Sequence, residues 1–409
     1  MLGCFRATAL KFLVRKSGAY SGPIFGATLL QYYRAVHKSG PPGGPLLRTA
    51  FRPILFFLAQ AGAVWHWWNF AVSRVPAGKR VLRLNLDETS VCLFPGTAKG
   101  TIMVKKRRLD AGPEVAQRMQ KAHRRTCLTH VGIICDHPGL QPLLPQVIIG
   151  NESTFLLRDW VELLHGTPPN VFLARQKSAW NSASMCVRVI ELLAAALRPH
   201  LQEFQAILLL DACRLHIHQD VLRACVSAGI WPVVVPARTT WLLQPCDSHA
   251  FQKYKMYLKA AYHRKRATTA AGVLDVSAFL EVLYDTIKCT LRGRRWASAF
   301  DEDGFGNDQS GLSSFVKRQL ALEQPPAVTR TPPSADELSL CFPKRAAVRS
   351  DIALQPLRQL ALPRPMAKGR PLFGRRSGVR AIGAAASSSS GNAAIAIAPP
   401  TAPAQAQGS

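Results

Sequence analysis

Residues 206–218 read AILLLDACRLHIH, and this stretch decides the fold that the sequence predicts. Its first five residues are apolar, which is typical of a buried strand, and Asp211 follows at the end of that strand. A helical pattern over 219–228 comes next, with Gly229 in the position that often ends helices, and 231–235 is another apolar strand. Strand, helix and strand in succession indicate a sheet with helices packed on it.

The same alternation extends outward in both directions. Short strands separated by turns are predicted upstream at 81–86, 91–95, 127–135 and 146–149. Helices are predicted at 182–198, 247–262 and 277–291. Together these elements predict an α/β domain over residues 81–310, built on a mixed sheet that is flanked by helices.

Three aspartates stand at similar places in this pattern. Asp87 ends a strand in NLDETS, Asp211 ends the apolar strand, and Asp247 opens a helix. Strand ends and helix starts are where a sheet gathers side chains from distant parts of a chain. Clustered carboxylates repel one another unless a divalent cation neutralises them, and Mg²⁺ prefers such oxygen ligands. Because each aspartate alone also fits a turn or cap role, the metal interpretation depends on all three together.

Three motifs that contain these aspartates carry a resemblance to a known family. They are NLDETS at 85–90, LLLDACRLHIH at 208–218 and VPARTTWLLQPCDSHAFQKYK at 235–255. Together they resemble the DDE-superfamily endonuclease domain of pogo-type (mariner-related) transposases. The third motif is the most specific, with Leu-x-Gln-Pro-x-Asp followed by a phenylalanine and a basic-aromatic helix. The resemblance covers about 81–310.

This resemblance implies a ribonuclease-H-like fold and a chemistry. Asp87, Asp211 and Asp247 would form the catalytic, metal-binding triad for Mg²⁺ or Mn²⁺, and the reaction would be cleavage and strand transfer of DNA. His216 matches a histidine of the family and would orient the site or contact DNA; a polar helix-entry residue is the alternative. Glu88 is not expected to be a ligand, since neighbouring strand residues point to opposite faces.

Departures from the family pattern support an alternative function. Ala212 stands where the family usually has asparagine, and Trp241 where a smaller polar residue is common. Residues 1–80 show no helix-turn-helix pattern of the kind that recognises transposon ends. The alternative is a non-catalytic nucleic-acid-binding derivative of a transposase, either a relic or a protein adopted by its host.

The charge distribution separates the chain into a mixed-sign middle and two basic flanks. The formal net charge is +28, from 52 Lys+Arg against 24 Asp+Glu, and no acid lies in 1–86 or 352–409. Such a charge predicts a polyanionic partner, either nucleic acid or an anionic membrane surface, and the resemblance implies DNA. The basic clusters also fit nuclear localisation signals, so we expect a nuclear protein. No small-molecule substrate is expected, and the oligomeric state is left open.

The flanks themselves are predicted from composition. Residues 1–80 form a basic, acid-free N-terminal region without a clear DNA-binding module, and residues 311–409 form a Pro/Ala/Ser-rich basic tail that we expect to be disordered. Within the first region, 54–72 fits a packing helix better than a membrane span, and the beginning of the chain also fits a transit peptide. Ten cysteines without a Cys-x-x-Cys pair favour reduced thiols in an intracellular protein.

Overall fold

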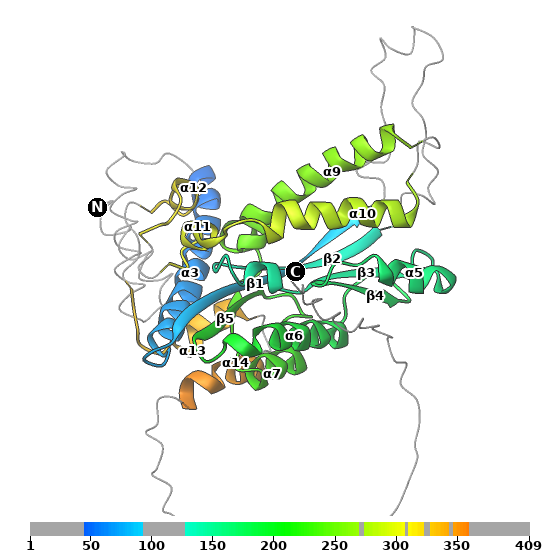
Figure 1. Ribbon diagram of the computed structural model, residues 1–409. Helices are drawn as coiled ribbons and strands as arrows, with labels where there is room; N and C mark the ends of the chain where they lie inside the picture. Colours follow the sequence, from blue (N-terminus) through cyan, green and yellow to red (C-terminus); the bar gives the residue numbers. More distant parts are fainter. Residues whose placement is uncertain are drawn as a thin grey trace, which may run out of the picture.

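The computed structural model describes residues 45–92, 127–269, 274–306, 310–322, 328–342 and 347–359. One six-stranded sheet, in the order β4-β3-β2-β1-β5-β6, forms its centre (Figure 1). The strands are β1 (Arg80–Cys92), β2 (Cys127–Cys135), β3 (Gln146–Asn151), β4 (Val171–Gln176), β5 (Phe204–Asp211) and β6 (Trp231–Val235). β2 pairs antiparallel with β1 and β3, whereas the other neighbours pair in parallel. This mixed sheet confirms the predicted α/β fold class.

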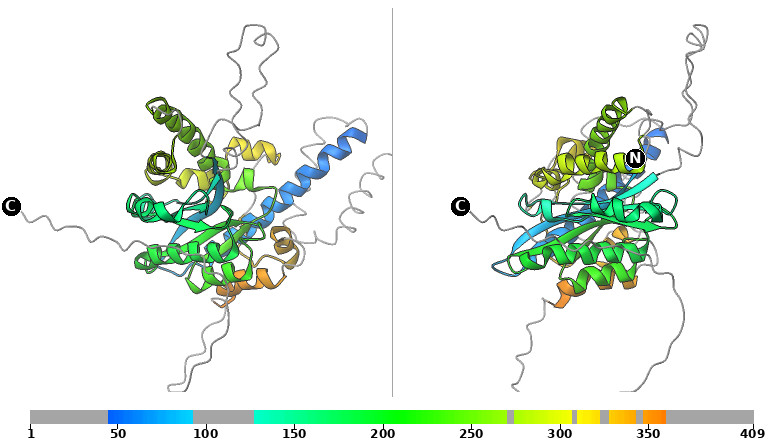
Figure 2. Two further views of the ribbon diagram at one scale, coloured as in Figure 1. Left: turned by 90° about the vertical axis from the view of Figure 1, so that its right-hand side faces the viewer. Right: turned by 45° about the vertical axis from the view of Figure 1, so that its right-hand side comes forward.

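Helices cover both faces of the sheet (Figures 1 and 2). One face packs on α6 and α7, and the other packs on α3, α9 and α10. The longer helices are α3 (Pro45–Ser73), α6 (Ala183–Leu197), α7 (Gln219–Ser227), α9 (Phe251–Ala267), α10 (Val276–Ile287) and α14 (Ala347–Gln359). Short helices are α5 (Trp160–His165), α8 (Thr240–Leu243), α11 (Ala297–Glu302), α12 (Ser314–Gln319) and α13 (Ala335–Cys341). Single turns are η2 (Gln141–Leu143), η3 (Leu157–Asp159), η4 (Arg198–His200), η5 (Cys246–Ala250) and η6 (Lys288–Arg292).

The first strand differs from its prediction. Two short strands at 81–86 and 91–95 with a turn between them are wrong, because β1 runs without interruption from Arg80 to Cys92. Residues 80–85 pair with β5 and residues 84–92 pair with β2, so the part of β1 beyond Asn85 is paired with β2 alone. A strand paired on one side tolerates polar side chains, so the polar letters DETS lie in a strand rather than in a turn.

The long helix α3 belongs to the packed structure. Its side chains Trp65, Trp67 and Trp68 are each at most 1% exposed and lie in the core shared with β6 and α13. His66, on the same helix, bonds through Nδ1 to the carboxylate of Glu337 in α13 at 2.8 Å. Within the ranges described above, no helix combines the length and apolarity that a bilayer crossing requires. The transit-peptide prediction falls on residues outside the described ranges.

The C-terminal limit of the packed region lies beyond residue 310, where the sequence analysis placed it. Leu338 in α13 and Leu354 and Leu357 in α14 are buried in the same core as α3. Figure 2 shows α14 beside α7 at one edge of the molecule. The prediction of a disordered tail from residue 311 is therefore wrong for the described parts of 311–359, which form helices packed on the core. Residues 360–409 lie outside the described ranges.

Candidate active site

Asp87 lies inside β1, at the point where the neighbouring strand β5 ends. The last β1 residue paired with β5 is Asn85, whereas Asp87 still pairs with Gly132 of β2. The expectation that Asp87 ends its strand is therefore wrong. Asp87 lies instead where β1 loses its pairing with β5 and continues with β2 alone. Its side chain is buried, with 7% exposed.

Asp211 is the last residue of β5, as predicted. The seven residues before it in the strand are all buried, and Asp211 is the first residue of the strand that is partly exposed to solvent. One carboxylate oxygen of Asp211 accepts the backbone N–H of Cys213 at 3.1 Å and also contacts Nδ1 of His216.

Asp247 lies in the π-helical turn η5, directly before α9. The residue reaches the surface although its carboxylate is partly covered, and its backbone N–H donates to the carbonyl of Gln244 at 2.8 Å. Gly132, opposite Asp87 in the sheet, lets α9 come close: a Cβ there would lie 3.0 Å from the ring of Phe251. The absence of a side chain at Gly132 thus allows the start of α9, and with it Asp247, to approach β1.

The three aspartates lie close enough for their charges to interact. Burial raises the pKa of Asp87 well above its ordinary value, and the charges of Asp247, Asp211 and Glu88 raise it further, against His216. Burial also raises the pKa of Asp247, opposed by hydrogen bonds with Asp87 and Thr240. This is the electrostatic pattern of carboxylates that share one site.

His216 connects Asp211 to a fourth carboxylate. It is fully buried, and its Nε2 lies 2.9 Å from Oε1 of Glu88 while Nδ1 contacts Asp211. Burial disfavours the charged imidazole, but Glu88 and Asp211 raise the pKa of His216 well above its ordinary value. Glu88 also accepts the side-chain amide of Asn181. His216 therefore links the carboxylates of Asp211 and Glu88.

Sequence reasoning missed two residues that hold the site. Asn85 is fully buried, and its side chain bonds both Leu209 of β5 and the backbone N–H of Cys246, next to Asp247. The period of two along a strand places Asn85 on the same face as Asp87, and this was the available signal. Asn181 precedes the predicted helix and carried no such signal.

The described residues contain no group of three or more His, Cys, Asp or Glu side chains arranged to hold a metal ion. Their nine cysteines form no disulfide. Asp87, Asp211 and Asp247, as they lie, do not form a closed ligand set. The donors still fit Mg²⁺ or Mn²⁺, because they are carboxylate oxygens whose mutual repulsion a divalent cation relieves. Gln244 adds a fully buried side-chain amide without a hydrogen-bond partner within the described ranges.

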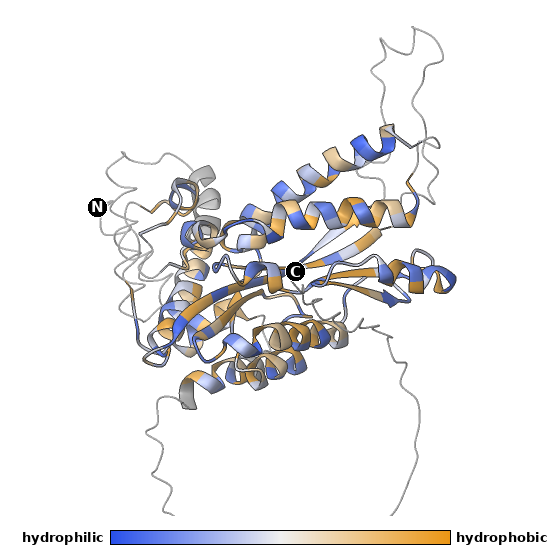
Figure 3. Cartoon of the chain, in the orientation of Figure 1, coloured by the Kyte–Doolittle hydropathy of each residue, from blue (hydrophilic) through white to orange (hydrophobic). Residues whose placement is uncertain are grey.

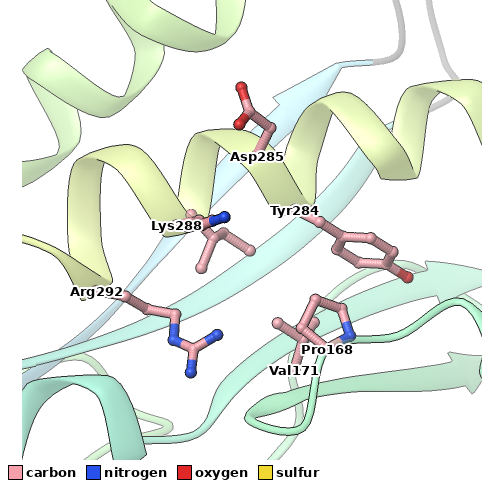
Figure 4. Close-up of a pocket in the computed structure, with 7 residues that line it drawn as sticks. Pro168, Val171, Tyr284, Asp285, Lys288 and Arg292 are labelled. Atoms are coloured by element: carbon pink, nitrogen blue, oxygen red, sulfur yellow. The ribbon is translucent and has the colours of Figure 1, made fainter.

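A separate pocket of about 420 Å³ lies at the far edge of the sheet (Figure 4). It is lined by Pro168, Val171, Tyr284, Asp285, Ile287, Lys288 and Arg292. In Figure 4, Tyr284 and Arg292 point from α10 and η6 toward the loop before β4. None of the three clustered aspartates lines this pocket, so it does not belong to the carboxylate site.

Two solved structures are similar to this chain. The chain is similar to the solved "Mos1 transposase paired-end complex with left transposon end", with a TM-score of 0.31 and 13% sequence identity over 73% of this chain and 78% of that chain. It is also similar to the "Crystal structure of the Mos1 mariner paired end complex with Mn", with a TM-score of 0.30 and 14% identity over 61% and 62%. No family model and no curated protein matches.

Proposed function

We propose that this chain is a metal-dependent DNA endonuclease and strand transferase of the DDE transposase type. One observation carries the proposal: Asp87, Asp211 and Asp247 come from three distant parts of the sequence and interact electrostatically beside the end of β5. Carboxylates that repel one another in a partly buried site lower the stability of a protein, so their convergence needs a functional reason.

The three aspartates would hold Mg²⁺ or Mn²⁺. When bound, such a cation polarises a phosphodiester and activates the attacking oxygen. Asp87 contributes a buried carboxylate from the sheet, and Asp247 contributes an exposed one that substrate can approach. His216 and Glu88 fix the orientation of the Asp211 side chain.

The charges of α9 support DNA as the partner. This helix has no acidic residue, and Figure 3 shows it largely hydrophilic where it leaves the sheet. Lys255 and Lys259 are exposed and one helical turn apart, so they lie on the same side of the helix. The charge of Lys255 also acts on Asp247 and lowers its pKa. A row of cations that begins beside the carboxylates suits a phosphate backbone entering the site.

The test is cleavage of supercoiled plasmid by the full chain. Wild type is expected to cut with Mg²⁺ or Mn²⁺ and to be inhibited by a chelator, and Asp211→Asn is expected to abolish cutting. Asp220→Asn is the matched control, because this exposed aspartate pairs with Arg223 and His218 at the surface. Equal activity of wild type and Asp211→Asn would contradict the proposal.

The second candidate is a DNA-binding protein that has lost the chemistry. It is favoured by the contact between Asp211 and His216, and by Ala212 at a position where the family usually has a polar residue. Under this proposal Mn²⁺ does not bind at the three aspartates, whereas DNA binding persists and weakens with salt. A Mn²⁺ titration of wild type and Asp87→Asn, compared with DNA binding, separates the two candidates.

For either function we propose a nuclear location, supported by the basic clusters of the sequence. Examples are Lys105-Lys106-Arg107-Arg108 and His263-Arg264-Lys265-Arg266. Imaging of a fluorescent fusion of the full chain tests it, and a signal confined to membranes or to an organelle other than the nucleus would contradict it.

A further inference from the structure

A buried carboxylate outside the aspartate cluster holds the turn that carries Asp247. Asp303 follows α11 and is 1% exposed. One of its oxygens accepts the hydroxyl of Ser248 at 2.6 Å, and the other accepts Nε2–H of His249 at 3.0 Å. Ser248 and His249 are the two residues directly after Asp247, so both carboxylate oxygens of Asp303 act on the same turn.

This turn needs such support because of its conformation. Residues Cys246–Ala250 form a π-helical turn, which is a rare conformation that occurs mostly at functional sites. Its first residue is fixed by the side chain of Asn85, whose oxygen accepts the N–H of Cys246 at 2.7 Å. Asn85 therefore holds the turn before Asp247, and Asp303 holds it after Asp247.

Asp303 is itself fixed by the N-terminal helix α3. The indole N–H of Trp65 donates to the backbone carbonyl of Asp303 at 3.0 Å. The next residue, Gly304, has a φ of 87°, and a Cβ there would lie 2.3 Å from Nε1 of Trp65. Only glycine fits both the conformation and the close approach. A continuous chain of contacts thus leads from Trp65 through Asp303 to the residues beside Asp247.

We propose that Asp303 is a positioning residue for Asp247, and that α3 acts on the active site through Trp65. The inference rests on the proposed function, since it assigns a task to residues around a carboxylate of that site. It gives α3 a role beyond core packing: the helix keeps one ligand of the metal site in place.

Two substitutions at Asp303 separate positioning from charge. Asp303→Ala removes both hydrogen bonds, and Mn²⁺ affinity of the full chain is expected to fall by about 10-fold or more, as for other residues that support ligands. Asp303→Asn keeps an oxygen for His249 and offers its amide N–H to the oxygen of Ser248, so affinity is expected to stay near that of wild type. If Ala binds Mn²⁺ as wild type does, the proposal is wrong.

Trp65 and Trp68 provide a matched pair on α3. Both indoles are buried and donate to backbone carbonyls of the same loop, Trp65 to Asp303 and Trp68 to Gly306 at 3.3 Å. Trp65→Phe is expected to weaken Mn²⁺ binding several-fold, whereas Trp68→Phe is expected to leave it unchanged at a similar loss of stability. Equal effects of the two changes would show that α3 acts only through general packing.

Hydrogen exchange without metal or DNA distinguishes failure of this inference from failure of the proposed function. The N–H groups of Asp247 and Ser248 both donate to the carbonyl of Gln244. In Asp303→Ala and Trp65→Phe their exchange is expected to speed up about 10-fold, with α6 unaffected. A protein that neither binds Mn²⁺ nor cuts DNA but shows this change keeps the positioning role and loses the nuclease. Unchanged exchange in both variants overturns the positioning role whatever the activity.

Discussion

The side-chain oxygen of Asn85 accepts the backbone N–H of Cys246 at 2.7 Å, across 161 residues of sequence. The amide nitrogen of the same side chain donates to the carbonyl of Leu209 in β5 at 3.0 Å. One buried asparagine therefore connects the strand of Asp87, the strand of Asp211 and the turn of Asp247. The relative position of the three aspartates depends on this side chain.

We expect Asn85→Ala to destabilise the fold and to impair the site. The change leaves the N–H of Cys246 and the carbonyl of Leu209 without these partners, and a buried unpaired polar group costs about 1–3 kcal/mol. Urea denaturation measures the free energy of unfolding, and a Mn²⁺ titration under native conditions measures the effect on the site.

Asn170→Ala is the control for Asn85. Asn170 is also buried and donates to the carbonyl of Leu144 at 3.0 Å, but it lies before β4. We expect a comparable loss of stability with Mn²⁺ affinity unchanged. Equal losses of Mn²⁺ affinity in the two variants would refute a specific role for Asn85.

His216→Leu is expected to slow plasmid cleavage by about 10- to 100-fold, because the supporting partners of metal ligands have effects of this size. The leucine cannot bond Asp211, so this carboxylate loses its fixed orientation. Glu88→Gln is the milder change: the glutamine oxygen can still accept from both His216 and Asn181. We therefore expect cleavage by Glu88→Gln to stay within a few-fold of wild type, and a loss as large as that of His216→Leu would argue for charge rather than orientation.

His130 makes the stability of the protein sensitive to acid. Burial lowers its pKa to about 4 from an ordinary value near 6.5. Its Nε2 lies 3.1 Å from the side-chain oxygen of Gln146, so Nε2 carries the proton and Nδ1 accepts the hydroxyl of Tyr254 at 2.9 Å. Because the unfolded chain binds a proton at higher pH than the folded chain does, stability is complete above about pH 6.5 and is lost as the pH falls toward 4.

His130→Gln removes this titrating group. We expect the variant to be less stable than wild type at pH 7 but to lose less stability between pH 6.5 and 4, as measured by urea denaturation at several pH values. His263→Gln, at an exposed position of α9, should reproduce the wild-type profile. If the stability of wild type and of His130→Gln fell equally between pH 6.5 and 4, His130 would not be the group that makes the protein sensitive to acid.

The sequence predicted the elements whose determinants are local. β5 and β6 are short apolar runs, and α6 and α7 begin and end at recognisable residues: Ser182 caps α6 by accepting the N–H of Met185, and Gly229 follows α7 with a φ of 73°. Each of these determinants lies within a few residues of the element it defines, so a single sequence suffices to find them.

The parts that escaped prediction depend on distant partners. β1 continues past Asp87 because β2 pairs with it, and α13 is stable because Glu337 meets His66 on α3, 271 residues away. A capping box at Ser334 and Glu337 was readable in the sequence, but the partner helix was not. For the same reason the aspartates could be named from their motifs, whereas Asp303, which acts on a turn 54 and 55 residues away, could not.

The two sides of α9 offer the sharpest test of DNA as the partner. Lys255→Ala with Lys259→Ala removes two exposed cations from the side that begins beside Asp247, and Lys253→Ala with Arg264→Ala removes two from the other side. Each phosphate contact contributes about 0.9 to the slope of log affinity against log salt concentration. If both lysines of the first pair contact phosphates, this slope should become shallower by about 2 in the Lys255/Lys259 variant, measured by fluorescence anisotropy with labelled duplex DNA in a chelator.

The Lys253/Arg264 variant carries the same net charge on the same helix, so it separates a specific contact from a general loss of positive charge. We expect its slope to stay close to that of wild type, because its cations lie on the side of the helix opposite to Lys255 and Lys259. Equal decreases in both variants would mean that α9 attracts DNA only through its total charge. An unchanged slope in the Lys255/Lys259 variant would show that these lysines do not contact DNA phosphates. The cleavage test with Asp211→Asn would still decide whether the aspartates cut DNA.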